Sequence, residues 1–304
     1  MPLNLVVFAG FYPAARHTVH YANHLAHALH GQLVLLHVKR ASLLDPYALM
    51  AESIRQEELG RATEVAAALC RLAEELHTQP TVEVATDLLP AVAENLATRY
   101  RPALFVLSQP DPAHADSSVA WDCVDLLRAG HFPVLVVSPT VPADQVPHRV
   151  LVAADRESFA LAAHAQALRQ LLSLPGTALI VAHVSSGTED DEGCSAALRA
   201  VQLSGLAQGL PTPELRGYEN DDYAEGLLAA VQDTQADLVI VLARERSYLG
   251  ELFHRSVTAR LLAKCPVPVL VLPVAADVPA PNSAQLAMAA QLTNSVLAGL
   301  APAN

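Results

Sequence analysis

The sequence predicts an α/β fold in which two similar domains follow each other along the chain, each built on a parallel sheet. Short apolar runs rich in β-branched residues alternate with longer segments of helical periodicity, as is typical of buried parallel strands and their crossover helices. The order of these elements in the first half of the chain recurs in the second half. Hydrophobic residues make up 52% and charged residues 16% of the sequence, which suits sheets covered by helices and excludes a disordered chain.

The first half alternates regularly between predicted strands and helices. After the first apolar run, a Phe-Tyr-Pro turn leads into a helix that ends near His30 and Gly31. Parallel strands need crossovers, and these are right-handed, so we expect a five-stranded sheet with helices on both faces. The predicted strands are residues 5–9, 33–38, 82–84, 104–107 and 134–137, and the predicted helices are 13–30, 51–77, 88–100 and 119–129.

The second half repeats this pattern. Its apolar runs correspond to runs of the first half in the same order and at nearly constant separation, which indicates a duplicated domain. One matched pair is VLLHV in the first half and IVAHV in the second. The matched segments are 5–8 with 150–153, 34–38 with 180–184, and 133–137 with 268–272.

The domain boundaries follow from a segment without apolar periodicity. Residues 138–148, SPTVPADQVPH, contain three prolines and are the predicted linker. In the tail, residues 283–300 place their apolar side chains within an arc of about 140° on a helical wheel, which predicts an amphipathic helix. This C-terminal amphipathic helix is expected to dock on its own domain or on a partner chain. We expect an N-terminal domain at 1–138, a linker at 139–148, a C-terminal domain at 149–274 and a tail at 275–304.

Charge and cysteine content restrict the possible partners. The formal net charge is −12, and the two lysines are Lys39 and Lys264. Binding to nucleic acid or to an anionic membrane requires clustered positive charge, so neither partner is expected. The four cysteines lie far apart in the sequence and contain no C-x2-C pair, which predicts reduced thiols. No run of 18 apolar residues occurs, and the N-terminus is predicted as a strand, so we expect a cytoplasmic protein.

Residues 236–273 have the order strand, loop, helix, strand. In such a βαβ unit the loop lies at the carboxyl edge of the sheet, where ligands bind. The unit resembles the last βαβ unit of the universal stress protein family, whose loop carries the pattern G-x2-G-x9-G-[ST]. Aligned without gaps, the glycine positions fall on Leu242, Glu245 and Arg255, and the Ser/Thr position falls on Ser256. The resemblance covers both halves and implies two doubly wound sheets of strand order 3-2-1-4-5. It also implies that the halves pair through their last strands.

The resemblance implies a nucleotide site in the C-terminal half. In the family, an Asp after the first strand lies near the adenosine moiety, and the glycines let backbone N–H groups reach the phosphates. Glu245 would place a carboxylate near those phosphates, which nearby arginines, Arg244 and Arg246 among them, could offset. Alternatively, Glu245 pairs with the arginines and fills the cleft. The residues assigned to ATP or AMP are Ala153, Asp155, Val184, Leu242, Ala243, Arg255, Ser256 and Val257.

The same site in the N-terminal half departs further from the family pattern. Gly10 stands where the Asp is expected. The crossing at 108–122, SQPDPAHADSSVAWD, has two prolines, three aspartates and no glycine. Each proline removes a donor N–H and each aspartate adds a negative charge, so no nucleotide is expected there. The Ser, His and Asp of this crossing lack a G-x-S-x-G elbow and do not indicate a catalytic triad.

Two clusters of polar side chains are candidates for cation binding. Five histidines lie on the first predicted helix, and the first four of them fall within about 80° of one another on a helical wheel. His20 and His24 have the i, i+4 spacing that lets two imidazoles reach one metal ion. Acids or cysteines that would complete the site are absent from that helix. We therefore expect a solvated polar face, with weak surface binding of zinc or nickel as the alternative. The acidic run at 189–192 is expected at a helix start, where carboxylates complement the helix dipole, with a loose cation site as the alternative.

The sequence favours a non-enzymatic protein that acts as a cytosolic stress-response or regulatory module. No P-loop lysine, Rossmann glycine pattern or catalytic carboxylate pair is present, and the phosphate glycines are replaced in both halves. No cofactor is expected, and weak ATPase activity stays open. One alternative is an adenine-nucleotide-binding protein that uses only the C-terminal domain. Another is a small-molecule or metal-binding protein. The implied pairing of the two halves as a pseudo-dimer is compatible with a monomer as well as with a homodimer. A protein partner is also expected, but the sequence does not identify it.

Overall fold

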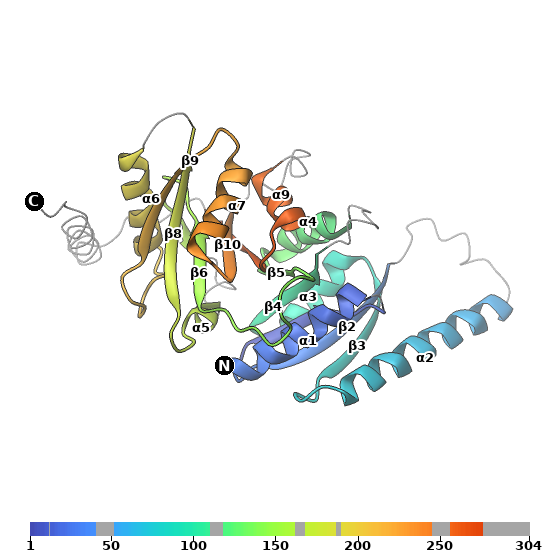
Figure 1. Cartoon of the computed structure of the whole chain (residues 1–304). Coiled ribbons are helices and arrows are strands. Elements are labelled where there is room, and N and C mark those ends of the chain that lie inside the picture. Colours follow the sequence, from blue (N-terminus) through green and yellow to red (C-terminus); the bar gives the residue numbers. More distant parts are fainter. Residues whose placement is uncertain are drawn as a thin grey trace, which may run out of the picture. The chain divides into compact units, whose positions relative to one another are not determined.

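The computed structural model describes residues 1–11, 13–40, 52–109, 118–161, 168–186, 190–244 and 256–275. The chain divides into two compact units (Figure 1): unit 1 ends at Val146 and unit 2 begins at Pro147. This division falls inside the segment predicted as a linker. The predicted tail helix at 283–300 lies outside the described residues.

Unit 1 contains a sheet of five strands in which neighbouring strands are parallel. The strand order within this unit is β3-β2-β1-β4-β5, which confirms the predicted order 3-2-1-4-5. The central strands β1 and β4 are almost fully buried because helices cover both faces of the sheet, whereas the edge strand β3 is partly exposed. The strands are β1 (Asn4–Phe8), β2 (Gln32–Arg40), β3 (Thr81–Asp87), β4 (Ala103–Ser108) and β5 (Val134–Val137).

The direction of the crossovers determines which face of the sheet each helix of unit 1 covers. The chain moves one way from β1 to β3 and the other way from β3 to β5, so right-handed crossovers place two helices on each face. In agreement, α3 and α4 contact each other, and α1 packs on β1, β2 and β4. No helix in the described ranges is both long and apolar enough to cross a membrane. The helices are α1 (Pro13–Ala28), α2 (Glu52–Glu74), α3 (Leu89–Arg99) and α4 (Ser118–Gly130).

Unit 2 repeats the same sheet. Its parallel strands have the order β9-β8-β6-β10-β11, again 3-2-1-4-5 when numbered along the unit. The edge strand β9 is largely exposed and carries charged side chains, whereas β10 and β11 are buried. The parallel strands are β6 (Arg149–Ala153), β8 (Ala178–Ser185), β9 (Glu214–Glu219), β10 (Leu238–Arg244) and β11 (Val269–Ala275), and the main helices are α6 (Asp191–Leu203), α7 (Tyr223–Thr234) and α9 (Val257–Lys264).

The two units differ in the segment between their first two long strands. In unit 1 this segment forms the 16-residue helix α1. In unit 2 its described residues form a two-residue strand, β7 (Ala160–Leu161), and a four-residue helix, α5 (Arg169–Leu172). Strand β7 is antiparallel to β11 and pairs with Val274 and Ala275. The chain after β6 therefore reaches the carboxyl end of β11, a departure from the repeat that the sequence did not predict.

The repeat extends to one side-chain contact. In unit 1, Nδ1 of His37 in β2 lies 3.4 Å from the carbonyl oxygen of Ala9, which follows β1. In unit 2, Nδ1 of His183 in β8 lies 3.0 Å from the carbonyl oxygen of Ala154, which follows β6. The backbone N–H of each alanine donates to the residue that precedes the histidine. These contacts hold the carboxyl ends of the first two long strands together in both units.

Candidate functional site

A pocket of about 340 Å³ lies at the carboxyl ends of the central strands of unit 2. Its walls come from β6, β8 and β10 and from the starts of α7 and α9. Strands β6 and β10 are neighbours whose onward crossovers run in opposite directions, and open α/β sheets bind ligands at this point. The lining is mainly apolar and consists of Ala153, Ala154, Asp155, Ala182, His183, Val184, Tyr223, Leu227, Val241, Leu242, Ser256, Val257 and Thr258.

The structure brings together most of the residues that the sequence assigned to a ligand. Ala243 is the exception among the described ones, because it is buried in β10 and is not part of the lining. Arg255 lies outside the described residues, as do Glu245 and Arg246. What the assembled residues bind stays a prediction. Those that line the pocket are Ala153, Asp155, Val184, Leu242, Ser256 and Val257.

Arg244, at the end of β10, has a role that the sequence did not indicate. Its side chain is 7% exposed, and its Nη2 donates to Oδ1 of Asp155 over 2.6 Å. Nη2 also donates to the carbonyl of Glu157 over 2.9 Å, and Nη1 donates to the carbonyl of Ser158 over 3.2 Å. In this structure the guanidinium of Arg244 is therefore held by the loop after β6, and whether Arg244 also offsets the charge of Glu245 stays a prediction.

The carboxylate of Asp155 is only partly used by this contact. Its side chain is 52% exposed, and its Oδ1 also accepts a hydrogen bond from the backbone N–H of Glu157 over 3.0 Å. Both of these hydrogen bonds use Oδ1, and Asp155 belongs to the pocket lining. The pocket therefore presents a carboxylate oxygen to a bound molecule, so a hydroxyl or amine donor suits it better than an anion does.

A smaller cavity of about 240 Å³ adjoins the pocket and shares His183, Val184 and Tyr223 with it. In this cavity the carboxylate of Asp190 contacts three other groups of the protein. Its carboxylate accepts from the Gly193 backbone N–H over 2.9 Å, pairs with Arg156, and lies 3.2 Å from Nε2 of His183. The hydrogen bonds from Gly193, His183 and Arg156 hold the pKa of Asp190 below its usual value.

The contacts of Asp190 also define the start of α6. Its side chain is the N-cap of that helix, and Asp191 and Glu192 are exposed in the first turn. The prediction that the acidic run lies at a helix start is confirmed for these three residues, but only Asp191 and Glu192 are solvated, because the side chain of Asp190 is 15% exposed. Glu189 lies outside the described residues. Because Asp190 is hydrogen-bonded at the helix start, it is not free to act as a separate cation ligand.

The sequence did not single out the residues that α7 contributes to the pocket. Tyr223 and Leu227 line it, and the side chain of Tyr223 is among the exposed large hydrophobic ones. A local signal existed, because Asp222 precedes an apolar helical pattern and is the N-cap of α7. That signal locates the helix start but does not say that the next residue faces a ligand pocket.

In unit 1, the equivalent strand ends carry different side chains. Gly10 follows the end of β1, as predicted from its position in the sequence. The exposed ring of Phe11 lies 6.1 Å from the ring of His37, measured between centroids. Residues 110–117, which include most of the proline- and aspartate-rich crossing, lie outside the described residues.

The histidine face of α1 is only partly solvated. As predicted, Val19, Ala22 and Leu25 occupy the buried face and the histidines do not. However, His24 is half-buried, and its ring lies 6.3 Å from the ring of His77 in an edge-to-face arrangement. His17 and His20 are half-buried as well, whereas His27 and His30 are exposed. Within the described part of the chain, no group of three or more His, Cys, Asp or Glu side chains is arranged to hold a metal ion.

The fold and the pocket define a duplicated α/β protein whose second unit carries the candidate ligand site. Residues 147–273, which include every lining residue of that site, match the model of the universal stress protein family. This match confirms the resemblance for the second half of the chain. It does not extend to the first half. Among curated proteins, none is significantly similar to this chain.

Solved structures show the same fold over most of the chain. A universal stress protein from Archaeoglobus fulgidus DSM 4304 is 18% identical, with a TM-score of 0.64, and the alignment covers 88% of this chain and 97% of that one. A candidate universal stress protein from Pseudomonas aeruginosa UCBPP-PA14 is 16% identical, with a TM-score of 0.50, covering 96% of this chain and 97% of that one. At such identities the likeness concerns the fold alone.

Proposed function

We propose that this protein is a non-enzymatic module of the universal stress type, which acts in a stress response or in regulation by binding and not by turnover. The match of residues 147–273 to the family supports the class of protein. The pocket of about 340 Å³ at the carboxyl edge of unit 2 supports a binding role. The changed glycine positions support a ligand other than the triphosphate that the family's loop accommodates.

The observation that carries this proposal is the presence of Leu242 in the pocket lining. Leu242 stands at the first glycine position of the family's phosphate loop. A leucine side chain takes up space through which backbone N–H groups would approach a phosphate. This feature favours a ligand without phosphates.

The contacts of His183 support binding without catalysis. His183 is the histidine of the described pocket lining, and it is buried. Its two ring nitrogens face the carbonyl of Ala154 and the carboxylate of Asp190. Both nitrogens are therefore engaged by groups of the protein itself. Weak ATPase activity stays an open question that a phosphate-release assay answers.

Calorimetric titration with ATP and Mg²⁺ tests this proposal. We expect the wild-type chain to give no binding heat at millimolar ATP. The matched control is the triple variant Leu242→Gly, Glu245→Gly and Arg255→Gly, which restores the glycine pattern and is expected to bind ATP more tightly than the wild type. Saturable binding of ATP to the wild type at micromolar concentration would contradict the proposal.

The second candidate is an adenine-nucleotide-binding protein that uses unit 2. It is favoured by one observation: Asp155, Val184 and Ser256, from three separate segments, line a single pocket. If this candidate is correct, ATP or AMP binds the wild type, and Asp155→Asn weakens that binding.

A small-molecule or metal-binding protein is the third candidate, for which native mass spectrometry of the purified chain would detect a retained ligand or ion. Four expectations stay predictions: that the two halves pair, that the chain forms a homodimer, that it has a protein partner, and that it is cytoplasmic.

A further inference from the structure

Two helices of unit 2 supply one side of the pocket. Tyr223 and Leu227 come from α7, and residues 256–258 come from the start of α9. The two helices contact each other and appear side by side in orange and red-orange in Figure 1. The distance between their N-terminal ends therefore sets the width of the pocket on this side.

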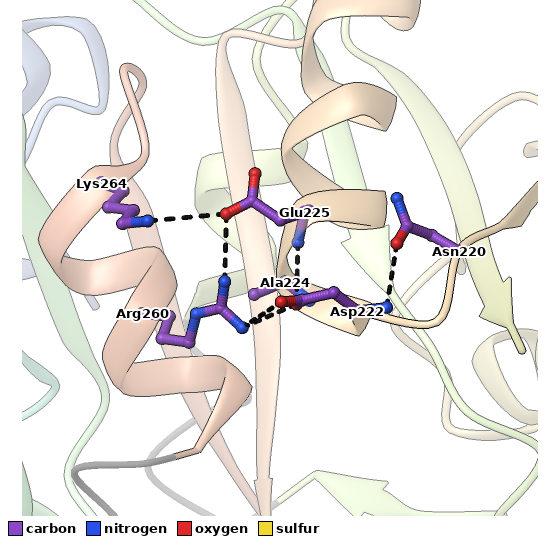
Figure 2. A network of polar contacts seen from close by, with 6 residues as sticks. All are labelled: Asn220, Asp222, Ala224, Glu225, Arg260 and Lys264. Atoms are coloured by element: carbon purple, nitrogen blue, oxygen red, sulfur yellow. Dashed lines mark hydrogen bonds and ion pairs between the residues drawn. The ribbon is translucent and has the colours of Figure 1, made fainter.

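A cluster of four charged side chains joins these helices. We call it the Arg260 cluster, and Figure 2 shows it between the first turn of α7 and the body of α9. Nη1 of Arg260 donates to both carboxylate oxygens of Asp222, over 2.7 and 2.6 Å. Nη2 donates to Oε1 of Glu225 over 3.0 Å, and Nζ of Lys264 lies 3.5 Å from the same oxygen. The cluster consists of Asp222, Glu225, Arg260 and Lys264.

On the α7 side, the carboxylates of the cluster belong to the first turn of the helix and its N-cap. Asp222 is the N-cap, and its Oδ1 accepts from the backbone N–H groups of Ala224 and Glu225 over 3.0 and 3.3 Å. Its own N–H donates to Oδ1 of Asn220 over 2.9 Å (Figure 2). Tyr223, which lines the pocket, directly follows this cap. Arg260 is one helical turn beyond Ser256, so it holds α9 close to the other lining residues.

Helix α7 is also held on the sheet independently of Arg260. An added Cβ at Gly226 would lie 2.6 Å from Cγ1 of Val184, so this helix lies very close to β8. Helix α9 has eight residues, too few to be stable as an isolated helix, and its position depends on packing and on the cluster. Of the two helices, α9 is therefore the one whose position Arg260 influences most.

We propose that Arg260 is a positioning residue for the pocket: by binding Asp222 and Glu225 it holds the start of α9 against the start of α7 and so sets the pocket opening. This inference rests on the proposed function, because it matters only if the pocket binds a ligand. The side chains of the cluster are between 35% and 59% exposed. Exposed ion pairs contribute little to stability, so loss of Arg260 should leave the fold intact.

The first test measures amide hydrogen exchange in the intact chain and needs no ligand. Arg260→Gln removes the contacts with both carboxylates, and Lys264→Gln, at the far end of the same cluster, is the matched control. We expect exchange at residues 257–259 to rise about fivefold in Arg260→Gln, which corresponds to the weak coupling of an exposed ion-pair network. Lys264→Gln should exchange like the wild type, and Arg260→Lys should fall between. Unchanged exchange at residues 257–259 in Arg260→Gln would overturn the proposal.

The second test measures affinity for adenosine and for ATP with Mg²⁺ alongside the unfolding midpoint. If the wild type binds either probe, Arg260→Gln should weaken binding at an unchanged midpoint, whereas Lys264→Gln should not. Equal affinity in the wild type and Arg260→Gln would overturn the positioning role. If the wild type binds neither probe, nucleotide and nucleoside are excluded as ligands of the proposed site, and the exchange result decides the role of Arg260.

Discussion

Arg244 and Asp155 are joined by a hydrogen bond of 2.6 Å between Nη2 and Oδ1, although they lie in different strand–loop junctions. Arg244 ends β10, and Asp155 lies in the loop that follows the neighbouring strand β6. The same guanidinium donates to the carbonyls of Glu157 and Ser158. One buried side chain thus holds the entire start of this loop at the rim of the pocket.

Replacing Arg244 by methionine should destabilise unit 2. The variant leaves the two loop carbonyls without their donor, and hydrogen bonds from a charged group are each worth about 2 kcal/mol. Because Asp155 is half exposed and can be hydrated again, we count only the two carbonyl bonds and expect a total loss of about 4 kcal/mol in the free energy of unfolding. Urea denaturation of the intact chain measures it. Arg156→Met, which removes an exposed arginine, is the control and should cost less than about 1 kcal/mol.

Replacing Gly226 by alanine should separate α7 from β8. The new Cβ would lie 2.6 Å from Cγ1 of Val184, closer than two carbon atoms can approach. We expect a loss of about 1–3 kcal/mol, as for other overpacked cores, despite the better helix propensity of alanine. The double variant Gly226→Ala with Val184→Ala removes the obstructing methyl groups. Thermal unfolding should show a partial recovery in the double variant relative to Gly226→Ala, and no recovery would mean that the strain arises elsewhere.

Asp222 should make stability depend on pH in the acidic range. The hydrogen bond from Arg260, supported by those from the backbone, lowers the pKa of Asp222 below its usual value of 3.8. A carboxyl whose pKa is lower in the folded state stabilises the fold above the unfolded pKa and loses this contribution as the pH falls through the folded pKa. Asp222→Asn keeps a good N-cap but lacks the charge. Its deficit in unfolding midpoint relative to the wild type should therefore be largest near neutral pH and shrink at acidic pH, and a deficit that does not change with pH would contradict the prediction.

The four thiols should react with iodoacetamide in a fixed order. Cys70 is exposed and should be alkylated first. Burial and the carboxylates of Asp190 and Asp191 raise the pKa of Cys194, so this half-exposed thiol should follow slowly. Burial raises the pKa of Cys123 to about 12 and that of Cys265 to about 11, so both should react only after unfolding. Mass spectrometry of labelled peptides measures the order, and early labelling of Cys265 would contradict the packing of unit 2.

The sequence predicted the sheets well because each central strand is a short apolar run with clear ends. β5 has the predicted bounds, and the other matched strands differ by a few residues at their ends. The strand order followed from the family resemblance and is the same in both units. The segment between β6 and β8 was not predicted, because the two-residue β7 is too short to leave a periodic pattern and depends on backbone pairing with β11.

The site was predictable only where the family resemblance could be aligned residue by residue. Ala153 and Val184, near the carboxyl ends of β6 and β8, were assigned in this way. The partnership of Arg244 with Asp155 could not, because it depends on which strands are neighbours and on which side chain the loop covers. The contact of Gly226 with Val184 is a similar case, since a glycine within a helix does not reveal how closely a distant strand approaches it.

The histidine that ends the second long strand touches the same alanine carbonyl in both units, at 3.4 Å for His37 and 3.0 Å for His183. In unit 2, Nε2 of His183 also lies 3.2 Å from the carboxylate of Asp190, which follows β8, whereas the residues that follow β2 in unit 1, 41–51, lie outside the described residues. The alanine contact joins the first two long strands of each unit, so loss of either histidine should loosen its own sheet at the carboxyl edge. In unit 2 that edge carries the pocket, and the same imidazole thus ties the sheet to the start of α6 through Asp190.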